Sequence, residues 1–234
     1  MNYLAIDAST EACSVALQYQ GKTFCRYELS PQSHSKLLLP QVDEVLNEAG
    51  VKLNQLDGLM FGRGPGSFTG VRIGIGVAQG LAYSANLPVI GVSTLQTMAQ
   101  QAFEQTKTTI VVAAIDARMS EIYCGAYKAD DNGIMQPLAA EQVFSPQLLA
   151  EKLNQLNINH HEVAGVGSAW QAYHEALAEC QLKRIDEQVR FPQAQYMLAI
   201  GSKDFADGQG VEAALAQPVY VRDTVTWKKL PGRE

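Results

Sequence analysis

Two aspartates in similar sequence surroundings are the residues best suited to chemistry. Asp7 follows the apolar run Tyr3–Ile6, and Asp116 follows the apolar run Ile110–Ile115. An aspartate at the end of a buried strand can cap the backbone amides of the next turn. It can also orient a magnesium ion or a water molecule beside the phosphates of a nucleotide. The sequence leaves both roles open.

A glycine-rich segment, Gly62–Arg72, is the second feature that could carry chemistry. It lacks the Gly-Lys-Ser/Thr of a Walker loop. Thr69 stands where a dinucleotide-binding motif has its third glycine. The segment instead predicts a tight turn and then a helix over residues 68–84, capped by Ser67 or Thr69.

This helix carries small residues on one face, namely Gly70, Gly74 and Ala78. Each interior glycine costs about 1 kcal/mol relative to alanine. We expect close backbone packing on that face to offset the cost. The packing partner is by default the chain's own sheet, and the alternative is a helix of another chain.

Histidines and cysteines form no metal-ligand pattern. The four cysteines are far apart and include no Cys-x-x-Cys pair, so neither a zinc site nor a disulfide framework is expected. His34 lies near an expected helix start, and the other histidines lie in polar segments: His160, His161 and His174. We expect no metal site.

The elements that position these residues follow a repeated order. In the first half we expect strands over residues 3–6, 13–20, 23–29, 59–61 and 88–92. Helices are expected between the cap at Ser33–Ser35 and Gly50, with a late start or a bend at Pro40, and over residues 68–84 and 94–104. In the second half we expect strands over residues 110–115, 122–127, 163–166 and 219–222 and near Val143. Helices are expected from Ser145 and over residues 169–179 and 196–205.

The sequence Ala5–Ala8 recurs as Ala114–Ala117 at the same hairpin corner in both halves. We therefore expect two related α/β lobes, residues 1–105 and 106–221, followed by a basic tail over residues 222–234.

Composition narrows the class of protein. The chain has 234 residues, of which 47% are hydrophobic, and a net charge of −6, which excludes an intrinsically disordered chain. Its apolar runs are far shorter than the roughly 20 residues of a membrane-spanning helix. We expect a soluble, cytoplasmic protein without the broad basic surface of one that grips nucleic acid alone.

The turn that begins at Asp7 resembles the Asp-x-Gly-Thr phosphate turn of the actin, sugar-kinase and Hsp70 superfamily. Ser9 stands in place of the glycine, and a side chain there hinders the approach of backbone amides to phosphate. The resemblance implies the actin-like ATPase fold, with two duplicated lobes, more strongly than it implies phosphate chemistry.

A longer set of motifs resembles the TsaB (YeaZ) family of bacterial tRNA threonylcarbamoyladenosine (t6A) biosynthesis proteins. The motifs are Gly64–Gly74, Ile6–Ser9, Asp116–Arg118, His34–Pro40 and Gly91–Leu95. The resemblance is dense in the first half and thinner in the second. It implies pairing with the paralogue TsaD, which transfers the threonylcarbamoyl group to adenosine 37 of tRNA, and with the small ATPase TsaE. It also implies no established catalysis by the chain itself.

TsaD holds its metal through a His-x-x-x-His pair, and this sequence departs from that pattern. Thr94 and Met98 stand where the two histidines would be. Neither is a plausible ligand for such a site, so a metal-dependent transferase or peptidase is disfavoured.

Two groups of residues are candidates for function. The candidates for a nucleotide cleft between the lobes are Asp7, Ser9, Asp116, Arg118, Gly165 and Gly167. A charged surface turn around Arg118 and a plain strand-to-helix turn at Gly165–Gly167 are the structural alternatives. The candidates for a partner or dimer interface are His34, Leu37, Leu38, Gln41, Val42, Val45, Leu46, Gly70, Arg72, Ile73, Gly74, Val77 and Ala78.

The preferred hypothesis is a non-catalytic subunit that supports TsaD and forms a homodimer when alone, with tRNA contacted through the complex. It requires no cofactor of its own, although ATP or ADP at the complex interface is compatible with it. The alternative is an ATP-binding phosphotransferase-like enzyme of the same superfamily, and a peptidase ranks last.

Overall fold

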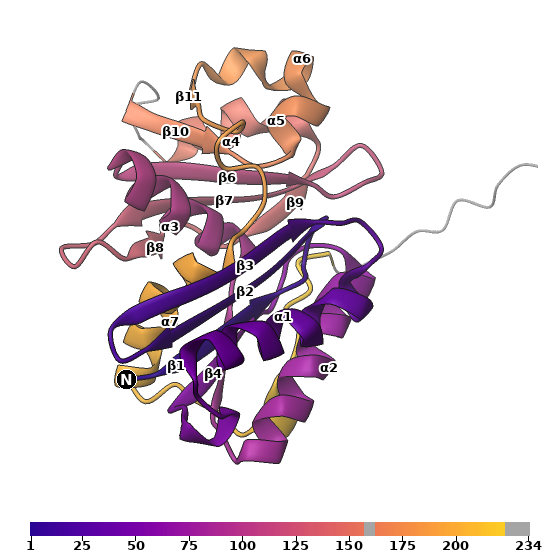
Figure 1. Cartoon of the computed structure of the whole chain (residues 1–234). Coiled ribbons are helices and arrows are strands. Elements are labelled where there is room, and N and C mark those ends of the chain that lie inside the picture. Colours follow the sequence, from indigo (N-terminus) through magenta and orange to yellow (C-terminus); the bar gives the residue numbers. More distant parts are fainter. Residues whose placement is uncertain (157–161, 223–234) are drawn as a thin grey trace, which may run out of the picture.

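The computed structural model describes residues 1–156 and 162–222, which fold into two α/β lobes (Figure 1). The first lobe is built on a five-stranded sheet in the order β3-β2-β1-β4-β5. Its strands are β1 (Tyr3–Asp7), β2 (Ala12–Tyr19), β3 (Lys22–Leu29), β4 (Gly58–Gly62) and β5 (Val89–Val92). β1 is antiparallel to β2 and parallel to β4, and β5 runs parallel to β4.

The second lobe repeats this topology. Its sheet has the order β11-β10-β6-β7-β8, and β9 also pairs with β7. The strands are β6 (Ile110–Asp116), β7 (Ile122–Ala129), β8 (Met135–Pro137), β9 (Gln142–Phe144), β10 (Val163–Val166) and β11 (Lys183–Arg184). β6 is antiparallel to β7 and parallel to β10, as β1 is to β2 and β4. Asp7 and Asp116 therefore end equivalent strands, as the repeat predicts.

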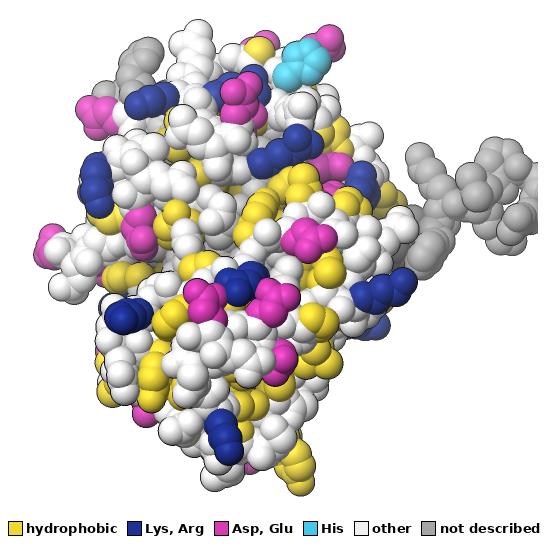
Figure 2. Space-filling view, in the orientation of Figure 1, with side chains coloured by type: hydrophobic (Ala, Val, Ile, Leu, Met, Phe, Trp, Pro, Cys, Tyr) yellow, Lys and Arg dark blue, Asp and Glu magenta, His cyan; other side chains and the backbone are white. Residues whose placement is uncertain are grey.

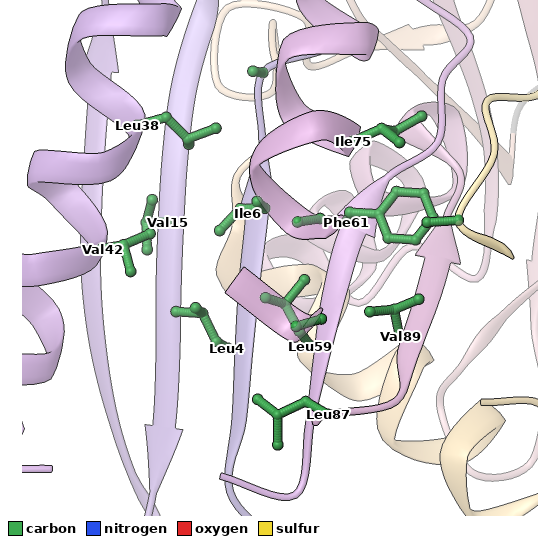
Figure 3. Packing of buried hydrophobic residues seen from close by; sticks show 14 of the residues in the cluster. Leu4, Ile6, Val15, Leu38, Val42, Leu59, Phe61, Ile75, Leu87 and Val89 are labelled. Carbon is green, nitrogen blue, oxygen red and sulfur yellow. The ribbon is translucent and has the colours of Figure 1, made fainter. Parts of the chain in front are cut away.

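Two helices cover one face of the first sheet: α1 (His34–Ala49) and α2 (Phe68–Ala85) (Figure 1). Leu38 and Val42 of α1 point toward Val15 of β2, in the same core cluster as Ile75 of α2 (Figure 3). α1 ends at Gly50, whose φ of 65° is the left-handed conformation that glycine adopts without strain. One side of each helix thus contributes to the core of this lobe.

Two helices pack on the sheet of the other half of the sequence, and three further helices cover the second sheet. α7 (Met197–Ala206) packs on the first sheet, where Met197 contacts the cluster that contains Met60. α3 (Thr94–Thr106) packs on the second sheet, where Met98 lies in a cluster with Val111. α4 (Leu149–Gln155), α5 (Ala169–Ala172) and α6 (His174–Leu177) cover the opposite face of that sheet. Helices α3 and α7 thus each pack on the sheet of the other half of the sequence. A division into two domains near residue 105 stays a proposal.

Strands β8 and β11 were not predicted, and three of the predicted elements differ in the structure. Residues 219–222 form no strand, because the sheet edge at β5 already pairs with Val211 and the segment runs across to the second lobe. The helix expected over residues 169–179 is broken at Tyr173, whose φ of −127° and ψ of 41° are not helical. α1 begins at His34 and contains Pro40, so a late start there is wrong.

Candidate functional site: the aspartate turns and the α1–α2 surface

Asp7 is buried at the end of β1 and is satisfied by its own turn. Its Oδ1 accepts hydrogen bonds from the Ser9 backbone nitrogen (3.0 Å) and from Ser9 Oγ (2.9 Å). Thr94 Oγ1 in turn donates to Ser9 Oγ (2.9 Å). The aspartate thus caps the turn that follows it, which is the structural role that the sequence allows.

The glycine-rich segment closes over this turn. A Cβ at Gly62 would lie 1.9 Å from Asp7 Oδ2, and one at Gly66 would lie 2.1 Å from the Ser9 carbonyl oxygen. The backbone nitrogen of Ser67 donates to that same oxygen (2.7 Å), and Ser67 caps α2 by accepting from the Gly70 nitrogen. The glycines are therefore explained by close packing on the Asp7 turn, without a phosphate.

Burial raises the pKa of Asp7 to about 6, although the hydrogen bonds from Ser9 oppose this shift. The protonated carboxyl group stabilises the fold fully below its ordinary pKa of 3.8, and this contribution is lost as the pH rises through about 6. Between those two values the folded chain binds more protons than the unfolded chain. Stability should accordingly fall with rising pH in this window.

Asp7→Asn should therefore raise the free energy of unfolding at pH 7.5 and leave it nearly unchanged at pH 4. The expected gain at pH 7.5 is of the order of 3 kcal/mol, since one pH unit of pKa difference corresponds to about 1.4 kcal/mol. Urea denaturation at both pH values measures it, with the exposed Asp131→Asn as a matched control. Equal stability differences at pH 4 and pH 7.5 would contradict this assignment.

Asp116 has a separate set of partners. Its Oδ1 accepts from the Arg118 backbone nitrogen (2.9 Å) and from the Tyr173 hydroxyl (2.8 Å), and its own nitrogen donates to Ser168 Oγ (3.1 Å). Burial and the hydrogen bond to Asp116 raise the pKa of Tyr173 to about 12. The two aspartates thus sit in equivalent turns but do not share hydrogen-bond partners.

The Asp7 and Asp116 turns meet across the lobes through Arg118. Its guanidinium lies 3.3 Å from Asp116 Oδ2 and 3.5 Å from Glu11 Oε1, and its side chain is 76% exposed. Such an exposed pair contributes little stability. The arrangement therefore presents a cation at the junction of the two lobes.

The candidate glycines of the second lobe also have packing roles. A Cβ at Gly167 would lie 2.1 Å from the Ala114 carbonyl oxygen, and its φ of +106° favours glycine. Gly165 lies against the ring of Trp170. These contacts support a plain strand-to-helix turn, and a role in binding a nucleotide remains a proposal.

The small face of α2 packs inside the first lobe. A Cβ at Gly70 would lie 2.1 Å from the Ala8 carbonyl oxygen, and Gly74 also faces Ala8. Ala78 is fully buried in the same core. These three residues face the chain's own sheet, which is the default packing partner expected from the sequence, and their place in a seam with another chain stays a prediction.

Five of the interface candidates on α1 are buried within the chain: His34, Leu38, Gln41, Val42 and Val45. Leu38, Val42 and Val45 pack in the core cluster that contains Val15 of β2 and Ile6 of β1 (Figure 3). A direct contact of these five residues with a partner stays a prediction.

Other candidates on the same two helices remain accessible. Arg72 is exposed, and the half-buried candidates are Leu37, Leu46, Ile73 and Val77. α1 and α2 lie side by side on the outer face of the first lobe (Figure 1). Gly76 and Gly80 of α2 are exposed, and a Cβ at either would meet nothing within 4 Å. We call the accessible side of these two helices the α1–α2 surface.

Sequence reasoning missed several large apolar side chains on or beside this surface. Leu39 is 50% exposed, Phe68 59%, Tyr83 82% and Tyr220 49%. Arg72 lies over the Phe68 ring, with its guanidinium carbon 3.7 Å from the centroid. The available signal was large apolar residues at helix positions outside the buried stripe.

The positions that correspond to the metal-binding histidines of TsaD are part of the interior. Thr94 and Met98 are both fully buried. Among residues 1–156 and 162–222, no three His, Cys, Asp or Glu side chains are grouped so that they could hold a metal ion. His160, His161 and the tail over residues 223–234 lie outside the described residues.

Comparisons with known proteins agree with this architecture. A family model described as TsaD, tRNA N6-adenosine threonylcarbamoyltransferase, matches residues 28–229. The solved structure of YeaZ from Pseudomonas aeruginosa has a TM-score of 0.86 and 42% identity, over 94% of this chain and 99% of that one. These findings confirm the expected α/β fold class with two lobes of the same topology. No helix in the described part of the chain is long and apolar enough to cross a membrane.

Two relatives match over the full length. The tRNA threonylcarbamoyladenosine biosynthesis protein TsaB of Escherichia coli is 48% identical over 234 residues, which is 100% of both chains. TsaB of Haemophilus influenzae is 45% identical over 241 residues, covering 100% of this chain and 99% of its own. The chain therefore belongs to the TsaB (YeaZ) family of tRNA threonylcarbamoyladenosine biosynthesis proteins.

Proposed function

We propose that this chain is a non-catalytic subunit that supports TsaD in t6A biosynthesis. The reaction is transfer of the threonylcarbamoyl group to N6 of adenosine 37 in tRNAs that read codons starting with A. The observation that carries this proposal is the full-length, 48% identity with TsaB of Escherichia coli.

The geometry of the first lobe supports a role without catalysis. Asp7 is buried and hydrogen-bonded within its own turn, so it is not free to orient a metal or a water molecule. Thr94 donates to Ser9 and supplies no metal ligand. The residues that would do chemistry in a related enzyme hold this fold together instead.

The α1–α2 surface is the contact that we propose for TsaD. The proposed contact residues are Leu37, Leu46, Arg72, Ile73 and Val77, with Gly76 and Gly80 allowing a partner helix to approach closely. Aromatic and arginine side chains are enriched at the centres of protein interfaces, and Phe68 with Arg72 provides such a pair. We propose that a second copy of the chain covers the same surface when TsaD is absent.

Family membership supports a further partner, a ligand and a location. We propose that TsaE joins the complex and that ATP or ADP binds at an interface within it. We also propose that these proteins act in the cytoplasm. Positive and negative side chains are interspersed over the face in Figure 2, and the whole chain carries −6. A long phosphate backbone needs an excess of positive charge. We infer that other subunits supply most of the contact with tRNA.

The test is reconstitution of tRNA modification with TsaD, TsaE and a threonylcarbamoyl donor, with and without this chain. The expected result is t6A formation only when the chain is present. Equal t6A formation without the chain would contradict the proposal.

The alternative is an ATP-binding phosphotransferase-like enzyme, which the corner aspartates favour. Measurement of ATP hydrolysis by the isolated chain separates the two hypotheses, with Asp116→Ala as the variant. Turnover by the wild type that Asp116→Ala abolishes would establish the alternative. No turnover above a buffer blank is the outcome that we expect.

A further inference from the structure

The turn between β6 and β7 has an unusual backbone. Arg118, Met119 and Ser120 have φ values of 63°, 55° and 60°, so three consecutive residues other than glycine are in the left-handed region. L-residues avoid this region because Cβ approaches the following carbonyl oxygen. Such a conformation persists only where surrounding contacts hold it.

Arg222 supplies contacts that hold this turn from outside. Its Nη2 donates to the Ala117 carbonyl oxygen (3.2 Å) and pairs with the Glu121 carboxylate, and its guanidinium lies over the Tyr123 ring. The Arg222 side chain is only 15% exposed. Inside the turn, the Ala117 nitrogen donates to the Glu121 carbonyl oxygen (2.9 Å). Arg222 thus bonds to both residues that close the left-handed turn.

The residues just before Arg222 are anchored on the first lobe. The Tyr220 hydroxyl accepts from Arg72 Nε (2.9 Å), and its ring packs near that of Phe68 at 6.0 Å between centroids. The Val219 nitrogen donates to the Arg63 carbonyl oxygen (2.9 Å). Three residues before Val219, the Ala216 carbonyl oxygen accepts from Gln79 Nε2 of α2 (3.1 Å). We call residues 216–222 the strap.

We propose that the strap transmits occupancy of the α1–α2 surface to the left-handed turn and so sets the position of Arg118. Tyr220 contacts Arg72 through its hydroxyl group and Phe68 through its ring. A protein bound over Arg72 and Phe68 would therefore also contact Tyr220. Only one residue separates Tyr220 from Arg222. The turn presents Arg118, a 76% exposed cation beside Glu11 and Asp116, at the junction of the lobes. This inference rests on the proposed function for the identity of the occupant, TsaD.

Hydrogen–deuterium exchange of the full-length free chain tests the strap. Arg222→Ala should raise the exchange rates of the Ala117 and Glu121 amides at least about tenfold, because their turn loses its outer support. The decisive variant is Arg72→Ala, which removes the Tyr220 anchor without contacting the turn. It should raise the same rates about threefold or more. The control is Arg26→Ala, which loses ion pairs with Glu44 and Glu48 elsewhere and should leave the turn unchanged.

Unchanged exchange at residues 117–121 in Arg72→Ala would overturn the proposal and leave Arg222 a purely local contact. Tyr220→Phe removes only the hydroxyl group, so it keeps the test decisive if an alanine variant unfolds. Protection of residues 117–121 on addition of TsaD is the expected second result, and it should shrink in Tyr220→Phe. TsaD that binds without changing this exchange would overturn the transmission. TsaD that does not bind at all would contradict the proposed function, while the free-chain result would still decide whether the strap acts on the turn.

Discussion

Gly76→Arg should abolish the complex with TsaD and leave the chain folded and at least as stable as the wild type. Gly76 is exposed on α2, and a Cβ there meets nothing within 4 Å. Arginine also has a higher helix propensity than glycine, which should stabilise the folded chain by up to about 1 kcal/mol. The arginine would nevertheless stand between Ile73 and Gly80 on the side where we place the partner helix. A buried, unpaired charge and a steric clash should weaken binding at least about 100-fold.

Titration calorimetry with purified TsaD, together with size analysis of the mixture, measures this effect. Asn154→Arg is the matched control, because it adds the same side chain to an exposed position of α4 in the other lobe. Unchanged affinity of Gly76→Arg would place the TsaD contact elsewhere. Gly74→Arg, the natural choice from sequence alone, is unsuitable because Gly74 faces Ala8 inside the lobe and the variant would disturb the fold.

Gly70→Ala and Gly76→Ala should change stability in opposite directions, although both make the same change in the same helix. The new Cβ at Gly70 would lie 2.1 Å from the Ala8 carbonyl oxygen, which is backbone and cannot swing away. We expect the free energy of unfolding to fall by about 3 kcal/mol. At Gly76 the Cβ enters open space. The higher helix propensity of alanine should therefore raise the free energy of unfolding by up to about 1 kcal/mol.

Urea denaturation of the two variants and the wild type at one pH measures both differences. A destabilisation of similar size in both variants would show that helix α2 is disturbed generally. Equal stability in all three proteins would show that Ala8 moves away at little cost. Either result would contradict the close approach of α2 to the Asp7 turn.

The local features of the fold could be predicted because each has a local cause. The recurrence of Ala5–Ala8 as Ala114–Ala117 indicated duplication, and the matching order of strands around β1 and β6 confirms it. Ser67 caps α2 and Gly50 ends α1, as their residue types predict.

What covers each apolar stripe could not be predicted in the same way. Periodicity shows that Leu38, Val42 and Val45 share a face, but it does not say whether that face meets the chain's own sheet or another protein. The structure places these three residues on the sheet. We therefore propose the accessible side of the same helices as the partner surface. Phe68 is exposed because the opposite side of α2 packs on the sheet.

The remaining differences arise from contacts between residues distant in sequence. α7 returns to pack on the first sheet because Met197 and its neighbours complete a core around Met60. A turn at Arg118 was expected, but its left-handed backbone was not, because the turn contains no glycine. Its support, Arg222, lies 101 positions along the chain from Glu121.

We propose that this chain acts through its α1–α2 surface and not through the buried Asp7 carboxylate. The direct measurement is formation of t6A in the reconstituted reaction, with Gly76→Arg or Asp7→Asn in place of the wild type. We expect that Gly76→Arg loses t6A formation and that Asp7→Asn retains it. Loss with Asp7→Asn while Gly76→Arg remains active, with both chains folded, would contradict it.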